Sequence, residues 1–134
     1  MRPLIAAIFA TAAITAMPAA PFAKERLTGE TKLAKLLEGR VAGEPQDCIR
    51  LASARGSEVI DGTAIVYRIG STLWVNRPEG GAESLDDDDI LVTRLSTGQL
   101  CSIDTVELRD RSSRMYSGFV SLGKFVPYRR VKGE

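Results

Sequence analysis

Four consecutive carboxylates, at residues 86–89, form the densest group of side chains in this sequence that could do chemistry. Ca²⁺ prefers oxygen ligands, and adjacent negative charges repel one another unless a cation neutralises them. The run lacks the alternate spacing and the central glycine of a dedicated calcium loop, so a solvated acidic loop is the simpler interpretation. The candidate calcium ligands are Asp86, Asp87, Asp88 and Asp89.

Three further acidic side chains, Asp104, Glu107 and Asp110, lie close together in the sequence. A pair of carboxyl groups can hydrolyse a glycosidic bond, one as the acid and the other as base or nucleophile. Nothing in the sequence marks a substrate cleft around them, and surface carboxylates are common in small β domains. We therefore assign no catalytic residue and keep these three for an enzymatic alternative.

The C-terminal stretch over residues 122–130 combines two aromatic residues, a proline and several cations. Aromatic rings supply contact area and arginines bind anions in a forked geometry, so this stretch could recognise a protein or an anionic glycan. The alternative is a closing strand whose rings cover the core, with its arginines solvated or paired to the acidic loop. The predicted partner surface comprises Lys124, Phe125, Tyr128, Arg129 and Arg130.

The sequence contains no histidine. This absence removes the commonest general base, the Ser-His and Cys-His nucleophile pairs and the usual zinc ligands. A glycine-rich phosphate-binding loop followed by Lys-Ser/Thr is also missing. These absences argue against most hydrolases, give no reason to expect a cofactor, and favour a non-enzymatic protein.

The two cysteines of the chain are Cys48 and Cys101. An even number of cysteines in an exported protein favours a disulfide, and the alternative is two separate buried thiols. The bond would close a loop of more than fifty residues, for which chain-entropy estimates give about 4 kcal/mol of stabilisation. Two cysteines alone do not complete a tetrahedral metal site, so we expect no metal there.

The N-terminus has the order of features typical of a secretory signal peptide. Arg2 supplies a positive charge, an apolar run extends over residues 4–17, and small residues with prolines lead to Ala23. The run is shorter than the about 20 residues that a membrane-spanning helix needs, although an uncleaved anchor is the alternative. We predict a signal peptide over residues 1–23 and one small exported domain over residues 24–134, periplasmic or secreted and without a membrane span.

The expected mature chain has balanced charge. Removal of residues 1–23 leaves 111 of the 134 residues, with 17 basic and 17 acidic side chains. This length is typical of one domain. The balance gives no reason to expect nucleic acid or a membrane surface as a partner.

The first elements that must position these residues are a helix and a hairpin. The apolar spacing predicts a helix over Glu30–Glu38, with Thr28 as its N-cap and Gly39 in the left-handed conformation at its end. Strands are expected over residues 48–51 and 58–60. The segments 63–69 and 72–76 flank Gly70-Ser71, which favours a type II′ hairpin with Tyr67 opposite Trp74 and Val66 opposite Val75. Both faces of this hairpin are largely apolar, which predicts a central position in the sheet.

A second hairpin is expected from residues 90–95 and 100–108, on either side of a turn at 96–99. Apolar residues change parity along 100–108, so we expect a β-bulge near Asp104. Residues 77–89 and 109–114 should form loops, 117–122 a strand and 125–128 a closing segment. The expected fold class is α+β and mostly β, with a short N-terminal helix packed on a small antiparallel sheet that can curl into a partly open barrel.

Three groups of residues spread over most of the mature chain form a recognisable set. They are GRVAG with Pro45 and DCI over residues 39–49, LC at residues 100–101, and GKFVPY over residues 123–128. The set resembles a family of small exported proteobacterial proteins classed as a domain of unknown function. The resemblance implies an exported domain, and no catalytic residue can be transferred from it. Relatives often hold a further cysteine pair near the positions of Ala82 and Val120, which this chain lacks.

These observations together predict an exported, disulfide-stabilised, non-enzymatic binding or envelope-associated module. Its expected partner is a protein or a glycan of the envelope. The alternative function is a small cell-wall-related hydrolase or an inhibitor of a wall-degrading enzyme.

Overall fold

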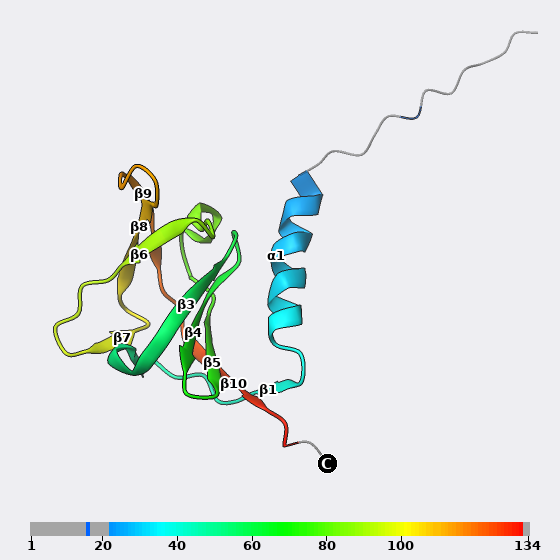
Figure 1. Cartoon of the computed structure of the whole chain (residues 1–134), viewed down its shortest axis with the longest axis vertical. Coiled ribbons are helices and arrows are strands. Elements are labelled where there is room, and N and C mark those ends of the chain that lie inside the picture. The colour runs from blue at the N-terminus through cyan, green and yellow to red at the C-terminus, as the bar shows by residue number, and fades with distance from the viewer. Residues whose placement is uncertain (1–15, 17–21, 133–134) are drawn as a thin grey trace, which may run out of the picture.

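The computed structural model describes Ala16 and residues 22–132 (Figure 1). The predicted signal peptide therefore lies outside the described residues, apart from Ala16, Phe22 and Ala23. The predicted cleavage site after Ala23 falls in the first turn of the helix that begins at Phe22. Among the helices that the structure describes, none is long and apolar enough to cross a membrane.

The described chain contains one α-helix, two 3₁₀-helices and ten strands. The helices are α1 (Phe22–Leu36), η1 (Leu51–Ser53) and η2 (Ala82–Ser84). The strands are β1 (Arg40–Ala42), β2 (Cys48–Arg50), β3 (Ala54–Ile60), β4 (Ala64–Ile69), β5 (Thr72–Asn76), β6 (Asp89–Val92), β7 (Gln99–Cys101), β8 (Thr105–Asp110), β9 (Tyr116–Ser121) and β10 (Phe125–Arg130).

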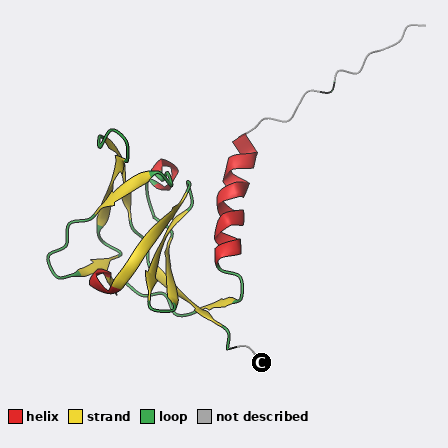
Figure 2. Cartoon of the chain, viewed as in Figure 1, coloured by secondary structure: helices red, strands yellow, loops and turns green. Residues whose placement is uncertain are grey.

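The strands form three antiparallel sheets (Figure 2). Sheet A has the order β1-β10-β5-β4-β3, sheet B pairs β2 with β7, and sheet C has the order β6-β8-β9. The helix stands on one side of sheet A, and sheets B and C lie on its other side. The sheets do not close into a barrel, which confirms the prediction of a mostly β fold in a partly open arrangement.

Two apolar clusters lie on opposite faces of sheet A. The larger one joins sheet A to sheets B and C and contains Ile65, Tyr67, Leu100, Leu108 and Phe125 among its buried members. The smaller one lies under the helix, where Leu33 packs with buried side chains of β4 and β5. Sheet A is therefore covered on both faces, which explains why its central strands are apolar on both.

The hairpin predicted around Gly70-Ser71 is confirmed, with its register. Tyr67 pairs with Trp74 and Val66 with Val75, and β4 and β5 occupy inner positions of sheet A. Gly70 has φ +60° whereas Ser71 has no positive φ. Positive φ at the first turn residue alone is the requirement of a type II′ turn.

The predicted start of the helix is wrong, because α1 begins at Phe22 rather than at Glu30. Thr28 is consequently not an N-cap but lies inside the helix. Gly29, the next residue, is buried against the turn between β3 and β4. A Cβ at this position would collide with Thr63 Oγ1 and the Asp61 carbonyl, so the glycine allows the helix backbone to reach the turn. Gly39 has φ +72°, which is the left-handed conformation predicted for the residue at the helix end.

The second hairpin is confirmed in part: residues 91–92 pair antiparallel with residues 107–108, but residues 100–108 form two strands instead of one. β7 pairs with β2, whereas β6 pairs with β8, so residues 90–95 never pair with residues 99–101. A turn over residues 102–104 separates the two strands, and the Asp104 carboxylate accepts the Cys101 N–H at 2.8 Å. This turn, not the expected bulge near Asp104, produces the change of apolar parity.

The buried hydroxyl of Tyr67 leads to a testable prediction. The side chain is 3% exposed, it packs edge-to-face on Phe125, and its hydroxyl has no hydrogen-bond partner among the described residues. The same burial raises the pKa of the Tyr67 phenol. Because an unpaired buried hydroxyl costs desolvation without compensation, Tyr67→Phe should raise the free energy of unfolding by about 1 kcal/mol.

Urea denaturation of Tyr67→Phe checks this expectation. Tyr116→Phe is a matched control, because Tyr116 is 59% exposed and its hydroxyl is free to bond to water; its substitution should leave the stability unchanged. A loss of stability in Tyr67→Phe would show that the hydroxyl has a bonding partner in the folded protein.

Candidate functional site

The two cysteines meet as predicted. Cys48 and Cys101 are directly opposite one another in the β2–β7 pair and form a disulfide with an S–S distance of 2.08 Å. The neighbouring pair, Ile49 and Leu100, points into the larger core. The bond therefore holds together a small two-stranded sheet that contributes apolar side chains to the interior. With both sulfurs bonded, the chain has no free cysteine to act as a nucleophile.

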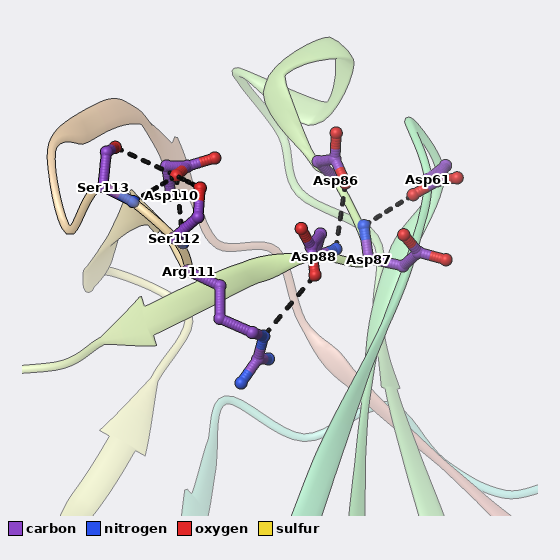
Figure 3. A network of polar contacts seen from close by, with 8 residues as sticks. All are labelled: Asp61, Asp86, Asp87, Asp88, Asp110, Arg111, Ser112 and Ser113. Carbon is purple, nitrogen blue, oxygen red and sulfur yellow. Dashed lines mark hydrogen bonds and ion pairs between the residues drawn. The ribbon is translucent and has the colours of Figure 1, made fainter.

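The acidic run at residues 86–89 is divided between different partners (Figure 3). Asp86 Oδ1 accepts the Asp88 N–H at 2.9 Å, Asp88 lies 3.6 Å from Arg111, and Lys32 Nζ lies 3.8 Å from Asp87. Asp89 is buried and accepts the Ser117 hydroxyl at 3.0 Å. The four carboxylates therefore do not converge on one point.

Among the described residues, the group that comes closest to a cation site includes an aspartate that the sequence analysis did not name. Carboxylate oxygens of Asp61, Asp86 and Asp87 lie within 4.8 Å of one another, and all three residues are exposed. Asp61 Oδ1 already accepts the Asp87 N–H at 2.6 Å, which joins the β3–β4 turn to the acidic loop. Calcium binding stays a prediction, checked by whether millimolar calcium raises the melting temperature.

The three carboxylates of the enzymatic alternative each accept hydrogen bonds from nearby groups. Glu107 Oε1 accepts Arg109 Nε at 2.8 Å, Asp104 caps its turn, and Asp110 lies at the β8–β9 turn. Each therefore has a structural partner. Asp104 and Glu107 do line the same surface hollow, of which Asp110 is not a lining residue.

Asp110 provides a prediction about acid stability (Figure 3). Its Oδ1 accepts the Ser112 hydroxyl at 2.6 Å and the Ser113 N–H at 2.7 Å. These bonds, led by the Ser112 hydroxyl, lower the pKa of Asp110 from 3.8 to about 2. As the pH falls, the Asp110 carboxylate is protonated in the unfolded chain before it is protonated in the folded protein. Its contribution to the stability of the fold is therefore complete above pH 3.8 and is lost as the pH falls from 3.8 through 2.

An NMR titration of the side-chain carboxyl carbons should therefore find Asp110 titrating well below the usual range for aspartate. The double variant Ser112→Ala, Ser113→Ala removes both hydroxyls and should return the pKa part of the way toward 3.8. An Asp110 that titrates normally in the unmodified protein would contradict the expectation.

The predicted C-terminal partner surface is not one surface. The prediction is wrong for Phe125, whose side chain is fully buried in the larger core. Tyr128 points to the opposite face of β10, where it is half-buried against the helix-side cluster. Lys124, Arg129 and Arg130 are exposed, and Lys124 Nζ lies 3.6 Å from Asp47. Alternation along the strand separates these residues, as in the alternative of a closing strand.

Aromatic side chains are exposed instead on the outer face of sheet C. Tyr116 is 59% and Phe119 is 54% exposed, although both belong to β9, whose Val120 is fully buried. Phe119 lies opposite Glu107, and Tyr116 lies opposite Arg109. Large exposed rings next to one another on a sheet face are typical of contact surfaces.

A shallow hollow of about 350 Å³ lies at these rings. We call it the aromatic face and define it by its lining residues: Val92, Arg94, Asp104, Thr105, Glu107, Tyr116 and Phe119. The lining combines two rings with two carboxylates, one guanidinium and two hydroxyls, those of Thr105 and Tyr116. This arrangement can stack against the flat side of a ligand and hydrogen-bond to its edge, which suits a sugar ring better than an anion.

Five residues of the aromatic face were not identified as site residues from the sequence: Val92, Arg94, Thr105, Tyr116 and Phe119. A signal was present in the predicted strand over residues 117–122, because Phe119 and Val120 point to opposite sides of any strand. If Val120 is interior, Phe119 must be exterior. The sequence alone did not say which of the two faces is the core.

No match to this chain was found among protein families, curated proteins or solved structures. The described features therefore define its class on their own: a disulfide-stabilised, mostly β module with a short helix.

Proposed function

We propose that this protein is an exported, non-enzymatic binding module of the cell envelope, and that it holds a glycan on the aromatic face. The main observation behind this proposal is that the rings of Tyr116 and Phe119 are both more than half exposed and lie in a hollow lined by hydrogen-bonding side chains. Aromatic groups exposed to water in this way contribute contact area to a partner without disturbing the core.

Three further observations support export and envelope location. Residues 1–23 have the composition of a signal peptide, the two cysteines form a disulfide, and the motif set resembles exported proteobacterial proteins. An oxidising compartment is where such a disulfide persists. The periplasm or the cell surface would also bring the aromatic face next to wall polysaccharides.

The test is co-sedimentation of the protein with purified peptidoglycan, and with cellulose as an unrelated polysaccharide. Phe119→Ala should weaken binding to peptidoglycan about fivefold, because one stacked ring contributes on the order of 1 kcal/mol. Val41→Ala is the matched control, since Val41 is 59% exposed on β1 and does not line the aromatic face. We expect that variant to bind as the unmodified protein does.

Two outcomes would contradict the proposal: failure to bind any polysaccharide, or unchanged binding by Phe119→Ala. Release of soluble wall fragments would favour the hydrolase, and inhibition of added lysozyme would favour the inhibitor. In either case Asp104→Asn and Glu107→Gln would show whether the carboxylates of the hollow take part.

A further inference from the structure

A second and larger hollow, of about 920 Å³, lies between the helix and the edges of two sheets. Its lining includes four residues of β3 (57–60), three of β6 (89–91) and three of α1 (Lys32, Lys35 and Leu36). β3 is the last strand of sheet A, and β6 is the last strand of sheet C. The hollow is therefore the opening between sheets that do not close into a barrel, and we call it the seam.

The free edge of β3 can be assigned residue by residue. A two-residue loop closes the β4–β5 hairpin, so Ile69 directs its backbone hydrogen bonds toward β5. The direction of the backbone hydrogen bonds alternates along an antiparallel strand, so the N–H and C=O groups of Arg68 and Val66 point toward β3. There Arg68 pairs with Gly56, and Val66 pairs with Glu58. The intervening residues of β3, Ser57 and Val59, must direct their N–H and C=O groups outward, into the seam.

The protein covers another sheet edge of the described chain but not this one. On β9, the backbone of Ser121 bonds to Gly80 and Glu79, so a loop occupies the edge of sheet C. Gly81 makes this close approach possible, because a Cβ there would collide with the Phe119 carbonyl. A strand edge that is left open next to a hollow is a template for an added strand.

Three cations and three acids line the seam, so its preference for a charged segment depends on which of them are already paired. Two lysines of α1 stand on one wall, and Arg111 lines the other. Most of these charges have partners within the protein: Glu58 lies 3.3 Å from Arg68, Lys32 lies 3.8 Å from Asp87, Arg111 lies 3.6 Å from Asp88, and buried Asp89 accepts the Ser117 hydroxyl. Lys35 has no ion pair within the described residues.

We propose that the seam binds an extended segment of a partner protein, which adds to β3 as an extra strand and places an acidic side chain next to Lys35. Ser57 and Val59 supply the main-chain hydrogen bonds, and the apolar side chains of Leu36, Ile90 and Leu91 contact its alternate residues. A free segment fits because β3 is recessed between α1 and β6. A second copy of this protein would present the same edge behind its own helix, so direct pairing of two β3 strands is hindered.

The test uses two synthetic peptides in NMR titrations of the full protein. Both have seven residues in which valine alternates with a charged residue, which is glutamate in one peptide and lysine in the other. The acidic peptide should shift the amide signals of Ser57 and Val59 in a saturable manner, and the basic one should bind at least tenfold more weakly. Lys35→Glu should reverse this preference.

Ser57→Pro is the decisive variant. The proline removes an N–H that points into the seam while leaving the β3–β4 pairs intact, and prolines are tolerated at such edge positions. It should abolish binding of the acidic peptide, whereas the matched control Ser57→Ala keeps the N–H and should bind normally. A folded Ser57→Pro protein, shown by unchanged amide signals in sheet C, makes the loss interpretable.

Three results would overturn the proposal: no saturable shift at millimolar peptide, equal binding of the two peptides, or unchanged binding by Ser57→Pro. Concentration-dependent dimerisation that Ser57→Pro abolishes would assign the seam to a second copy instead. Phe119→Ala should not affect peptide binding, so this experiment is independent of the aromatic face.

Discussion

Replacing both Cys48 and Cys101 with alanine should lower the free energy of unfolding by about 4 kcal/mol. The two residues are separated by 53 positions, and the bond restricts the unfolded chain accordingly. Small domains are stable by only about 5–15 kcal/mol, so the loss is a large part of the total. The β2–β7 pair, which directs Ile49 and Leu100 into the core, should be the first part to loosen.

Urea denaturation followed by tryptophan fluorescence measures the effect, because Trp74 packs against the larger core. The unmodified protein treated with a thiol reductant is the control and should show the same loss as the double variant. If the double variant retains its full stability while the oxidised protein contains the bond, the stabilisation by loop closure is refuted.

Asn76→Ala should also be strongly destabilising, with a loss of about 3 kcal/mol in the free energy of unfolding. Asn76 is fully buried in β5, and its Nδ2 donates to the Gly123 carbonyl at 2.7 Å while its Oδ1 accepts the Gly123 N–H at 3.0 Å. One side chain thus satisfies both backbone groups of a residue just before β10. Alanine leaves both groups buried and unpaired, and each unpaired group costs about 1–3 kcal/mol.

Thermal unfolding of Asn76→Ala compared with Gln99→Ala checks this expectation, because Gln99 is an exposed amide in a strand. Asn76→Asp tests the two hydrogen bonds separately, because it keeps an acceptor for the Gly123 N–H and loses the donor to the Gly123 carbonyl. Equal melting temperatures for Asn76→Ala and Gln99→Ala would mean that the pair with Gly123 does not stabilise the fold.

The importance of Gly123 gives a physical reason for part of the GKFVPY motif. A Cβ at this position would collide with the Arg77 carbonyl, so the glycine lets the chain pass close to the end of β5. Phe125 and Pro127 then point into the interior. The buried residues of the motif therefore serve folding, and our proposal places the partner surface on the aromatic face of sheet C instead.

The two proposed surfaces differ in what they can bind. The aromatic face offers rings and hydrogen-bonding side chains on the outside of sheet C, whereas the seam offers the backbone of an edge strand and a free lysine. A module with both could hold a wall polysaccharide and an envelope protein at once. The Phe119→Ala and Ser57→Pro variants separate these two activities.

The amino-acid sequence by itself determined the features that depend on neighbours in the chain. Gly70-Ser71 between two apolar runs was enough for the β4–β5 hairpin and its register, because turn geometry sets the pairing. Gly39 ended the helix for a similarly local reason. The disulfide was also predictable, since each of the two cysteines in the sequence has the other as its one possible partner within the chain.

Only the tertiary structure decided which distant segments meet. β7 pairs with β2 rather than with its neighbour, and Gly29 continues the helix because it contacts a turn that lies more than thirty positions later. The same holds for the outward position of Tyr116 and Phe119 and for the burial of Phe125. Side chains along a strand alternate between its two faces, and the alternation alone does not show which face is buried. The buried face is the one against which another sheet packs.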